Sequence, residues 1–469
     1  MSRLLRGMHS NDSLTENGAV THSTTSSLLL DYFSTAGALR GHSENSIAIL
    51  FSKAFGEDPL NALRAFFWTR DCRGGAGERR TFRVILKWLA DNHTEAIIRN
   101  INLVSHFGRW DDLFELMGTS CEDAALLLYK TALEDGNALA AKWAPRPRSS
   151  KATNAYKLRS YMNLSEKWYR KMLSRLSKTV EQQMCANQWT EIKYEHVPSL
   201  AMTRYRKAFS RRDPEGFQKY MEAVAAGTKK IHAGVLYPHD IICQYLDSSG
   251  RDNVLEEQWK ALPDFLKDNQ ENMLPVIDVS GSMYCGSFKP RPIDAAVSLA
   301  LYLSERNTGI FKDHFIEFSS RAKLQKIAGQ SLKDRMDNIC SANWGMSTDV
   351  QGAFNLVLST AQRYELPERE MPTMLVCISD MRWNPSGSIT NLEMIQLKYK
   401  RLGYKMPKLI FWNLNAESQN HPAKFNDSGV CLISGYSPAI MKFVLTGETV
   451  TPHELMMQVL QSDRYMEIK

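Results

Sequence analysis

Three oxygen-bearing side chains, Asp278, Ser280 and Ser282, occur in the order Asp-x-Ser-x-Ser. The apolar run of residues 274–279 that leads into them is typical of a short buried strand, and the glycine between the serines allows a tight turn. A helix-like run follows from Pro292. Strand, polar turn and helix is the arrangement of a ligand site at the carboxyl edge of an open α/β sheet. Hard oxygen ligands of this kind suit Mg²⁺ or Mn²⁺.

Two later stretches place further oxygen ligands in comparable positions. Thr348 lies in a glycine-containing loop before a helix-like run, and Asp380 follows the apolar run of residues 374–379. The order of these stretches resembles the metal-ion-dependent adhesion site of von Willebrand factor A domains. In that family the metal keeps an open position, which an acidic group of a partner can fill. Alternatively, these residues are ordinary polar strand ends. The resemblance implies a metal site made of Asp278, Ser280, Ser282, Thr348 and Asp380.

Strand-like and helix-like patterns alternate in the C-terminal part of the chain. Strands are expected at residues 312–318, 373–378, 408–413 and 429–435, and helices at residues 351–358, 392–399 and 453–461. This alternation predicts a mostly parallel, doubly wound sheet, so residues 273–469 are expected to form a domain similar to a von Willebrand factor A domain. Residues 246–272 are expected to connect it to the preceding part, and residues 284–290 lengthen the loop beside the metal site.

Amphipathic helical patterns fill residues 26–245. Residues 1–25 are rich in Ser, Thr, Asn and Gly, which predicts a flexible lead-in. A glycine-rich corner interrupts the helices and is either a tight helix–helix turn or an anion-binding loop, since its spacing fits neither a Walker loop nor a dinucleotide fingerprint. The residues that define this corner are Arg73, Gly74, Gly75, Gly77 and Arg79.

Three short sequences in the helical part carry a family resemblance. They are Arg-Asp-x-Arg-Gly-Gly-x-Gly-Glu-Arg at residues 70–79, Gly-Arg-Trp-Asp-Asp-Leu at 108–113 and Trp-Ala-Pro-Arg at 143–146. Followed by an A domain, they resemble the Ro ribonucleoprotein family, and more closely a domain-of-unknown-function relative of it found in bacteria, plants and phages. The resemblance implies a ring of HEAT-like helical repeats, the TROVE module, with single-stranded RNA ends in its hole and structured RNAs on its outer basic face. No strict repeat period is detectable, so the ring is expected from the resemblance alone.

The net charge of +7 is unevenly distributed along the chain. Residues 142–230 carry 20 Lys and Arg against 7 Asp and Glu, a balance of +13, whereas the rest carries 38 against 44, a balance of −6. Cations neutralise phosphates and aromatic rings stack on unpaired bases, so a basic segment interleaved with Tyr and Trp suits single-stranded nucleic acid. The alternative is a set of amphipathic helices whose aromatic side chains face the core. The predicted RNA-binding residues are Lys157, Arg159, Arg170, Lys171, Arg204, Arg206, Lys207, Arg211 and Arg212.

The composition, 43% hydrophobic and 23% charged residues, is typical of a soluble globular protein, and 469 residues predict two or three domains. There is no run of about eighteen apolar residues, and residues 1–8 lack the apolar core of a secretory signal. The eight cysteines are scattered without a Cys-x-x-Cys pair, which argues against a disulfide framework. We therefore expect a cytoplasmic protein without membrane association.

Three functions are compatible with these patterns. The leading hypothesis is an RNA-binding ribonucleoprotein component whose A domain binds Mg²⁺ (or Mn²⁺) and docks a protein partner through an acidic side chain. The second is a virion-associated or scaffold protein that uses the A domain for metal-dependent protein adhesion. A metal-dependent enzyme is least favoured, because no His or Lys at a suitable spacing supplies a general base and no catalytic residue is predicted. The oligomeric state is left open.

Overall fold

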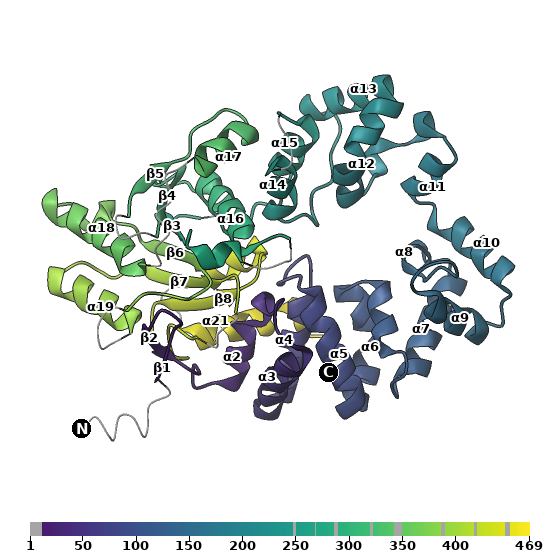
Figure 1. The fold of residues 1–469 in the computed structure, drawn as a ribbon, viewed down its shortest axis with the longest axis horizontal. Helices are drawn as coiled ribbons and strands as arrows, with labels where there is room; N and C mark the ends of the chain where they lie inside the picture. The colour runs from purple at the N-terminus through teal and green to yellow at the C-terminus, as the bar shows by residue number, and fades with distance from the viewer. Residues whose placement is uncertain are drawn as a thin grey trace.

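The computed structural model describes residues 12–246, 250–267, 269–285, 289–318, 322–341, 349–385, 390–416, 420–445 and 451–469. Within these ranges the chain forms an N-terminal helical part and a C-terminal α/β domain (Figure 1). This order confirms the predicted fold class. No helix of the described ranges combines the length and the apolarity that a membrane-spanning segment requires.

The helical part begins with a short antiparallel hairpin and continues as an arc of helices (Figure 1). Local sequence explains several helix starts: Asp58 accepts a hydrogen bond from the backbone of α4, Pro59 occupies the first helical position, and Ser165 caps α10. The elements are β1 Asp12–Leu14, β2 Val20–His22, α2 Leu28–Phe33, α3 Glu44–Glu57, α4 Pro59–Arg70, α5 Arg79–Asn92, α6 Thr94–Phe107, the 3₁₀ segment Trp110–Leu116, α7 Glu122–Glu134, α8 Ala138–Trp143, α9 Ala152–Tyr161, α10 Glu166–Ser177, α11 Val180–Cys185, α12 Ser199–Arg212, α13 Pro214–Ala225, α14 Pro238–Leu246 and α15 Asn253–Lys260.

The α/β domain contains a sheet with the strand order β5-β4-β3-β6-β7-β8, in which the described residues supply six strands. All neighbouring strands are parallel except β5, which pairs with β4 in the antiparallel direction. The elements are β3 Met273–Ile277, α16 Pro292–Arg306, β4 His314–Glu317, β5 Leu324–Lys326, α17 Leu332–Cys340, α18 Val350–Arg363, β6 Met374–Ser379, α19 Asn391–Leu402, β7 Lys408–Asn413, β8 Val430–Ser434, α20 Met441–Val444 and α21 Pro452–Leu460. The mostly parallel sheet and the predicted strand positions are confirmed; the short, polar edge strand β5 was not predicted.

The two faces of the sheet bury different clusters, because successive strand side chains point to opposite sides. Leu274 and Val276 of β3 face a cluster that includes side chains of α18 and α19. Met273 and Ile277 face the opposite side, where the apolar core is continuous with α2, α4 and α16. One face of the sheet therefore shares its core with the helical part, and the two parts pack as one body.

The helical arc begins and ends against the α/β domain (Figure 1). At its start, the Gly37 amide donates to Ser434 Oγ at 3.0 Å. At its end, the Trp259 indole donates to Glu305 at 2.7 Å. The two ends of the arc also meet each other, since the Tyr237 hydroxyl donates to the Cys72 carbonyl at 3.3 Å. The helical part is thus attached to the α/β domain at both ends of the arc.

The N-terminal hairpin corrects one prediction. Residues 1–25 were expected to be a flexible lead-in, but from residue 12 on they are ordered, with Asp12 paired to His22 across the hairpin. The His22 amide also donates to the His421 carbonyl at 3.1 Å. The polar composition that predicted flexibility instead supplies side chains that hydrogen-bond to the α/β domain.

Candidate metal centre and nucleic-acid surface

The predicted metal residues Asp278, Ser280 and Ser282 lie at the carboxyl end of β3. The Ser280 amide donates to Asp278 Oδ1 at 2.9 Å, and the hydroxyls of Ser280 and Ser282 are 3.1 Å apart. Asp380 follows β6, the parallel neighbour of β3, so its carboxylate reaches the same edge of the sheet. The Ser282 side chain lies close enough to Asp380 to lower the pKa of that carboxyl. The structure therefore brings together four of the five predicted residues.

The fifth predicted residue, Thr348, lies outside the described residues. The next described residue is Asp349, whose carboxylate caps α18 by accepting from the Gly352 amide at 3.1 Å. Among the described residues no group of three or more His, Cys, Asp and Glu side chains is arranged to hold a metal ion. Any metal at this edge would accordingly depend on hydroxyl and carboxylate oxygens together.

The electrostatics of the site favour a cation. Asp278 and Asp380 are both almost fully buried. Burial raises the pKa of Asp278, and burial together with the neighbouring Asp278 charge raises the pKa of Asp380 to about 7. Asp380 Oδ2 is buried and has no hydrogen-bond partner among the described residues. Two buried carboxyls with converging hydroxyls, and one carboxylate oxygen that lacks a hydrogen-bond donor, fit a hard divalent cation such as Mg²⁺ or Mn²⁺.

The raised pKa predicts pH-dependent metal binding. The folded metal-free protein retains the Asp380 proton that the unfolded chain loses above about pH 4, so this group lowers stability as the pH rises from about 4 to about 7. A metal binds the ionised carboxylate and offsets that loss. We expect Mg²⁺ to raise the melting temperature more at about pH 7.5 than at about pH 5.5. Differential scanning fluorimetry measures both shifts, and equal shifts would contradict the assignment.

Sequence reasoning missed the neighbours of this site. The N-terminal hairpin lies beside it, with Thr15 Oγ1 donating to the Trp383 carbonyl at 2.7 Å. Glu16 forms an ion pair with Arg382, and Arg382 forms a second one with Asp380. A local sequence pattern cannot predict these contacts, because the residues are more than three hundred and sixty positions apart in the chain.

The glycine-rich corner is packed against protein atoms. A Cβ at Gly75 would collide with the Trp68 carbonyl, and one at Gly77, where φ is +69°, would collide with the Tyr237 hydroxyl. The Arg464 guanidinium reaches the corner from the C-terminal end of the chain and donates to Asp71 Oδ1 at 2.7 Å. These contacts favour the helix–helix turn over an anion-binding loop for Gly74, Gly75 and Gly77. Arg73 and Arg79 remain on the surface.

The second corner forms an ion-pair network with the first. Asp112 is buried and pairs with Arg70 at 2.8 Å and with Arg83 at 2.6 Å. Asp111 pairs with Arg83 at 3.0 Å and with Arg109 at 2.8 Å. Burial would raise the pKa of Asp111, but the hydrogen bonds and charges of Arg109 and Arg83 hold it below its usual range. Two of the three short sequences that carry the family resemblance, residues 70–79 and 108–113, are therefore structural partners.

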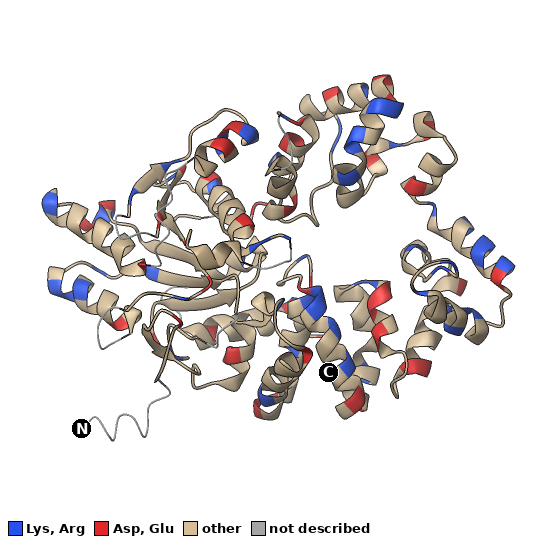
Figure 2. Ribbon diagram, in the orientation of Figure 1, with Lys and Arg blue, Asp and Glu red and all other residues tan. Residues whose placement is uncertain are grey.

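The predicted RNA-binding residues divide into two groups. Arg206 is buried, with its guanidinium bound to Asp252 at 2.6 Å, so its inclusion in the predicted surface set is corrected. Lys157 is partly buried and pairs with Glu122, and Arg159 is partly buried against the Tyr156 ring. The exposed members are Arg170, Lys171, Arg204, Lys207, Arg211 and Arg212. Figure 2 shows Lys and Arg along α10 and on α12.

Most aromatic side chains of this segment belong to the core. Tyr194 and Phe209 pack in a buried cluster, as the alternative interpretation expected, and Tyr169 is fully buried. Trp168 and Tyr156 are the exceptions among the large hydrophobic side chains of α9 and α10, with 62% and 60% of their surface exposed. The Lys171 ammonium lies 5.3 Å from the Trp168 ring centre. The described surface of α9 and α10 thus combines aromatic faces with cations.

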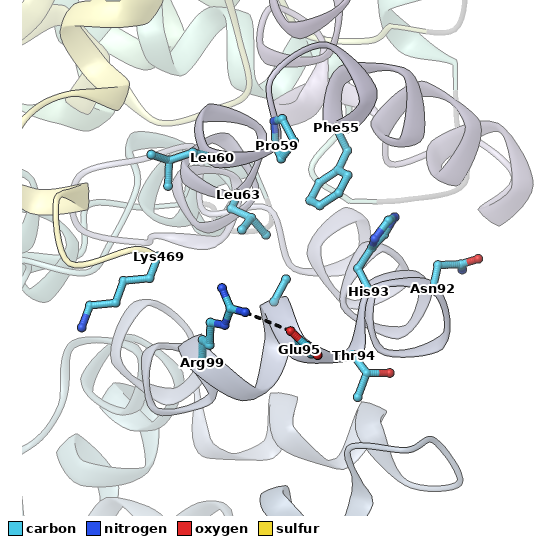
Figure 3. A pocket seen from close by; sticks show the side chains of 11 residues that line it. Phe55, Pro59, Leu60, Leu63, Asn92, His93, Thr94, Glu95, Arg99 and Lys469 are labelled. Atoms are coloured by element: carbon cyan, nitrogen blue, oxygen red, sulfur yellow. Dashed lines mark hydrogen bonds and ion pairs between the residues drawn. The ribbon is translucent and has the colours of Figure 1, made fainter.

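A cavity of ≈ 530 Å³ lies between the α3–α4 and α5–α6 turns (Figure 3). Phe55, Leu60 and Leu63 line it. Two of its charged side chains, Glu95 and Arg99, bind each other at 2.9 Å, and Lys469 also lines it. Because no predicted site residue lines the cavity, it is separate from the metal centre and from the basic surface.

Comparison with known proteins places the chain in a family. The family model described as a domain of unknown function, DUF2828, matches residues 15–134 and 137–271, more than half of the chain. The chain therefore belongs to this family, as the predicted kinship with a domain-of-unknown-function group implied. A second domain of unknown function, DUF7788, matches residues 272–468, which correspond to the α/β domain.

Two individual proteins show the extent of the similarity. The uncharacterized protein L728 of Acanthamoeba polyphaga mimivirus is 28% identical over 507 residues, covering 96% of this chain and 87% of that protein. The Ro (RSR) protein of Deinococcus radiodurans superposes with a TM-score of 0.45 and 16% identity, covering 94% of this chain and all of that one. A likeness of this extent does not establish a shared function, so the predicted RNA-binding role of the Ro family remains a prediction for this chain.

Proposed function

We propose that this protein binds RNA through the exposed cations and aromatic rings of α9, α10 and α12. The observation that carries the proposal is the exposed Trp168 ring beside Lys171 on α10. That helix carries four cations and one acidic residue, and α12 carries four exposed cations besides the buried Arg206 and no acidic residue. Exposed rings stack on unpaired bases of any sequence, and the surrounding cations neutralise the backbone phosphates.

A groove between α12, α13 and α15 supports the same function. It has a volume of ≈ 520 Å³ and is lined by the cations Lys207 and Arg211 on one side. Phe217 and Met221 contribute apolar surface to it. A cationic wall beside an apolar surface suits a nucleotide unit, which presents a phosphate and an apolar base face.

The α/β domain adds a docking function to this proposal. A divalent cation held by Asp278, Ser280, Ser282 and Asp380 supplies a positive charge that accepts a carboxylate from a protein partner. The buried Asp380 Oδ2, which accepts no hydrogen bond from the described residues, supports this interpretation. The second candidate is a scaffold or virion-associated assembly protein in which such docking is the main activity. Purified protein that binds an acidic partner with Mg²⁺ but shows no affinity for RNA would favour the second candidate.

Replacing Trp168 by alanine should weaken binding of a single-stranded RNA oligonucleotide about tenfold, since one stacked base contributes about 1–3 kcal/mol. Fluorescence anisotropy with a labelled oligouridylate measures the dissociation constant. Tyr364→Ala is the matched control, because Tyr364 is another exposed ring, 64% exposed, with the Arg363 guanidinium 5.6 Å from its centre. It lies in the α/β domain and should leave binding unchanged.

The salt dependence of binding tests the cations separately. The logarithm of the association constant should fall linearly with the logarithm of salt concentration, and Arg170→Gln with Lys171→Gln should reduce that slope by about 2. Affinity that is independent of salt, or a Trp168→Ala protein that binds as tightly as the wild type, would contradict RNA binding at this surface.

A further inference from the structure

The N-terminal hairpin is fastened to the loop that follows β6. Thr15 Oγ1 donates to the Trp383 carbonyl at 2.7 Å, and Asn17 Nδ2 donates to the Arg382 carbonyl at 2.5 Å. This loop begins with Asp380, one of the two buried carboxylates of the metal centre. The hairpin therefore lies within two residues of a predicted metal ligand, although it is more than three hundred and sixty residues away in the chain.

Two series of side-chain contacts join the hairpin to the two carboxylates. In the first, the Trp383 indole donates to Ser379 Oγ at 3.1 Å, and Ser379 Oγ donates to Asp278 Oδ2 at 2.6 Å. In the second, Arg382 Nε lies 3.3 Å from Glu16 Oε2 and 3.6 Å from Asp380 Oδ2. Each carboxylate of the metal centre thus has an indirect connection to the hairpin.

The contacts of Arg382 with Glu16 and Asp380 have an electrostatic consequence. Asp380 is fully buried and the Arg382 side chain is 20% exposed, so their charges interact where water screens them weakly. A divalent cation bound to Asp380 would repel Arg382, and Glu16 offers that guanidinium an alternative carboxylate on the side of the hairpin. Removing Glu16 would take away this alternative carboxylate, so the guanidinium would stay closer to Asp380.

We propose that Arg382 and Glu16 set the affinity of the metal centre: Arg382 competes with the cation for Asp380, and Glu16 reduces that competition. This inference rests on the proposed metal centre. Linkage makes the effect reciprocal, so metal binding strengthens the pairing of Arg382 with Glu16 and the attachment of the hairpin. Arg382 and Glu16 act through Asp380 and are positioning residues, not ligands.

Isothermal titration of the full chain with Mn²⁺ tests the proposal. Arg382→Gln should bind Mn²⁺ about fivefold more tightly than the wild type and Glu16→Gln about fivefold more weakly, each a change of about 1 kcal/mol. The double variant should bind like Arg382→Gln, because Glu16 acts only through the arginine. Arg382→Lys keeps the charge and should remain near the wild-type affinity. Glu95→Gln, in the distant exposed pair with Arg99, is the matched control and should have no effect.

A second readout follows the hairpin itself. Hydrogen exchange of the amides of residues 12–22 should slow when Mg²⁺ is added to the wild type and should not respond in Glu16→Gln. Opposite signs for the two single variants cannot come from loss of fold, since an unfolded protein would not bind Mn²⁺ more tightly. If wild type and variants bind Mn²⁺ equally, the coupling is refuted and the metal centre stands. If the wild type does not bind Mn²⁺, both are refuted.

Discussion

Replacing Asp112 by alanine should lower the free energy of unfolding by about 3–5 kcal/mol, the cost of leaving a buried charge without its partner. The Asp112 side chain is fully buried and accepts from Arg70 Nε at 2.8 Å and from the Arg109 amide at 2.9 Å. The Arg70 side chain is only 5% exposed, so water cannot replace the lost carboxylate. Urea unfolding followed by circular dichroism measures the difference.

The control for this experiment is a solvent-exposed ion pair on the protein surface. Glu95 and Arg99 are 86% and 64% exposed, and Glu95→Ala should cost less than about 0.5 kcal/mol, as surface pairs usually do. A double variant, Arg70→Ala with Asp112→Ala, removes both buried charges and should be less destabilised than the sum of the single variants. A cost for Asp112→Ala no larger than that of Glu95→Ala would show that the network does not stabilise the corner.

The two corner sequences were predicted from a family resemblance, and their pairing through this network is seen only in the structure. Arg70 ends α4 and Asp112 lies in the 3₁₀ segment after α6, so the pair joins two turns of the helical arc. The sheet domain was predictable for a different reason: its strands are short apolar runs, buried on both faces, and polar side chains follow β3 and β6. Parallel pairing of β3 with β6 then brings Asp278 and Asp380 together.

Other features were not predictable because they depend on tertiary contacts alone. Arg206 belongs to a strongly basic helix, and nothing in its neighbours reveals that Asp252 binds it in the interior. The hairpin of residues 12–22 has the polar composition of a loop, and the α/β domain supplies its partners, such as the His421 backbone. Periodicity identifies which helix faces are apolar, but it cannot tell that Trp168 is exposed while Tyr169 is buried.

Replacing Asp380 by asparagine should abolish stabilisation by Mg²⁺ without destabilising the metal-free protein. The substitution removes one of two buried carboxylates, so it relieves like-charge repulsion in the absence of metal and eliminates a ligand in its presence. We expect the metal affinity to fall at least about a hundredfold, a loss of about 2.7 kcal/mol. Thermal melts with and without Mg²⁺ measure both effects, and Glu95→Gln is the control that should retain the full metal response.

Asp380 is a better target than Asp278 for this test because the two carboxylates differ in the hydrogen bonds that they accept. Asp278 accepts from the Ser280 amide and from the Ser379 hydroxyl, so its replacement would disturb the loop as well as the metal. Asp380 has an oxygen without a hydrogen-bond partner among the described residues. A metal-free Asp380→Asn protein that melts well below the wild type would mean that this carboxylate stabilises the fold, through Arg382 or Ser282, and is not primarily a metal ligand. An Asp380→Asn protein that keeps its Mg²⁺ response would place the bound metal elsewhere.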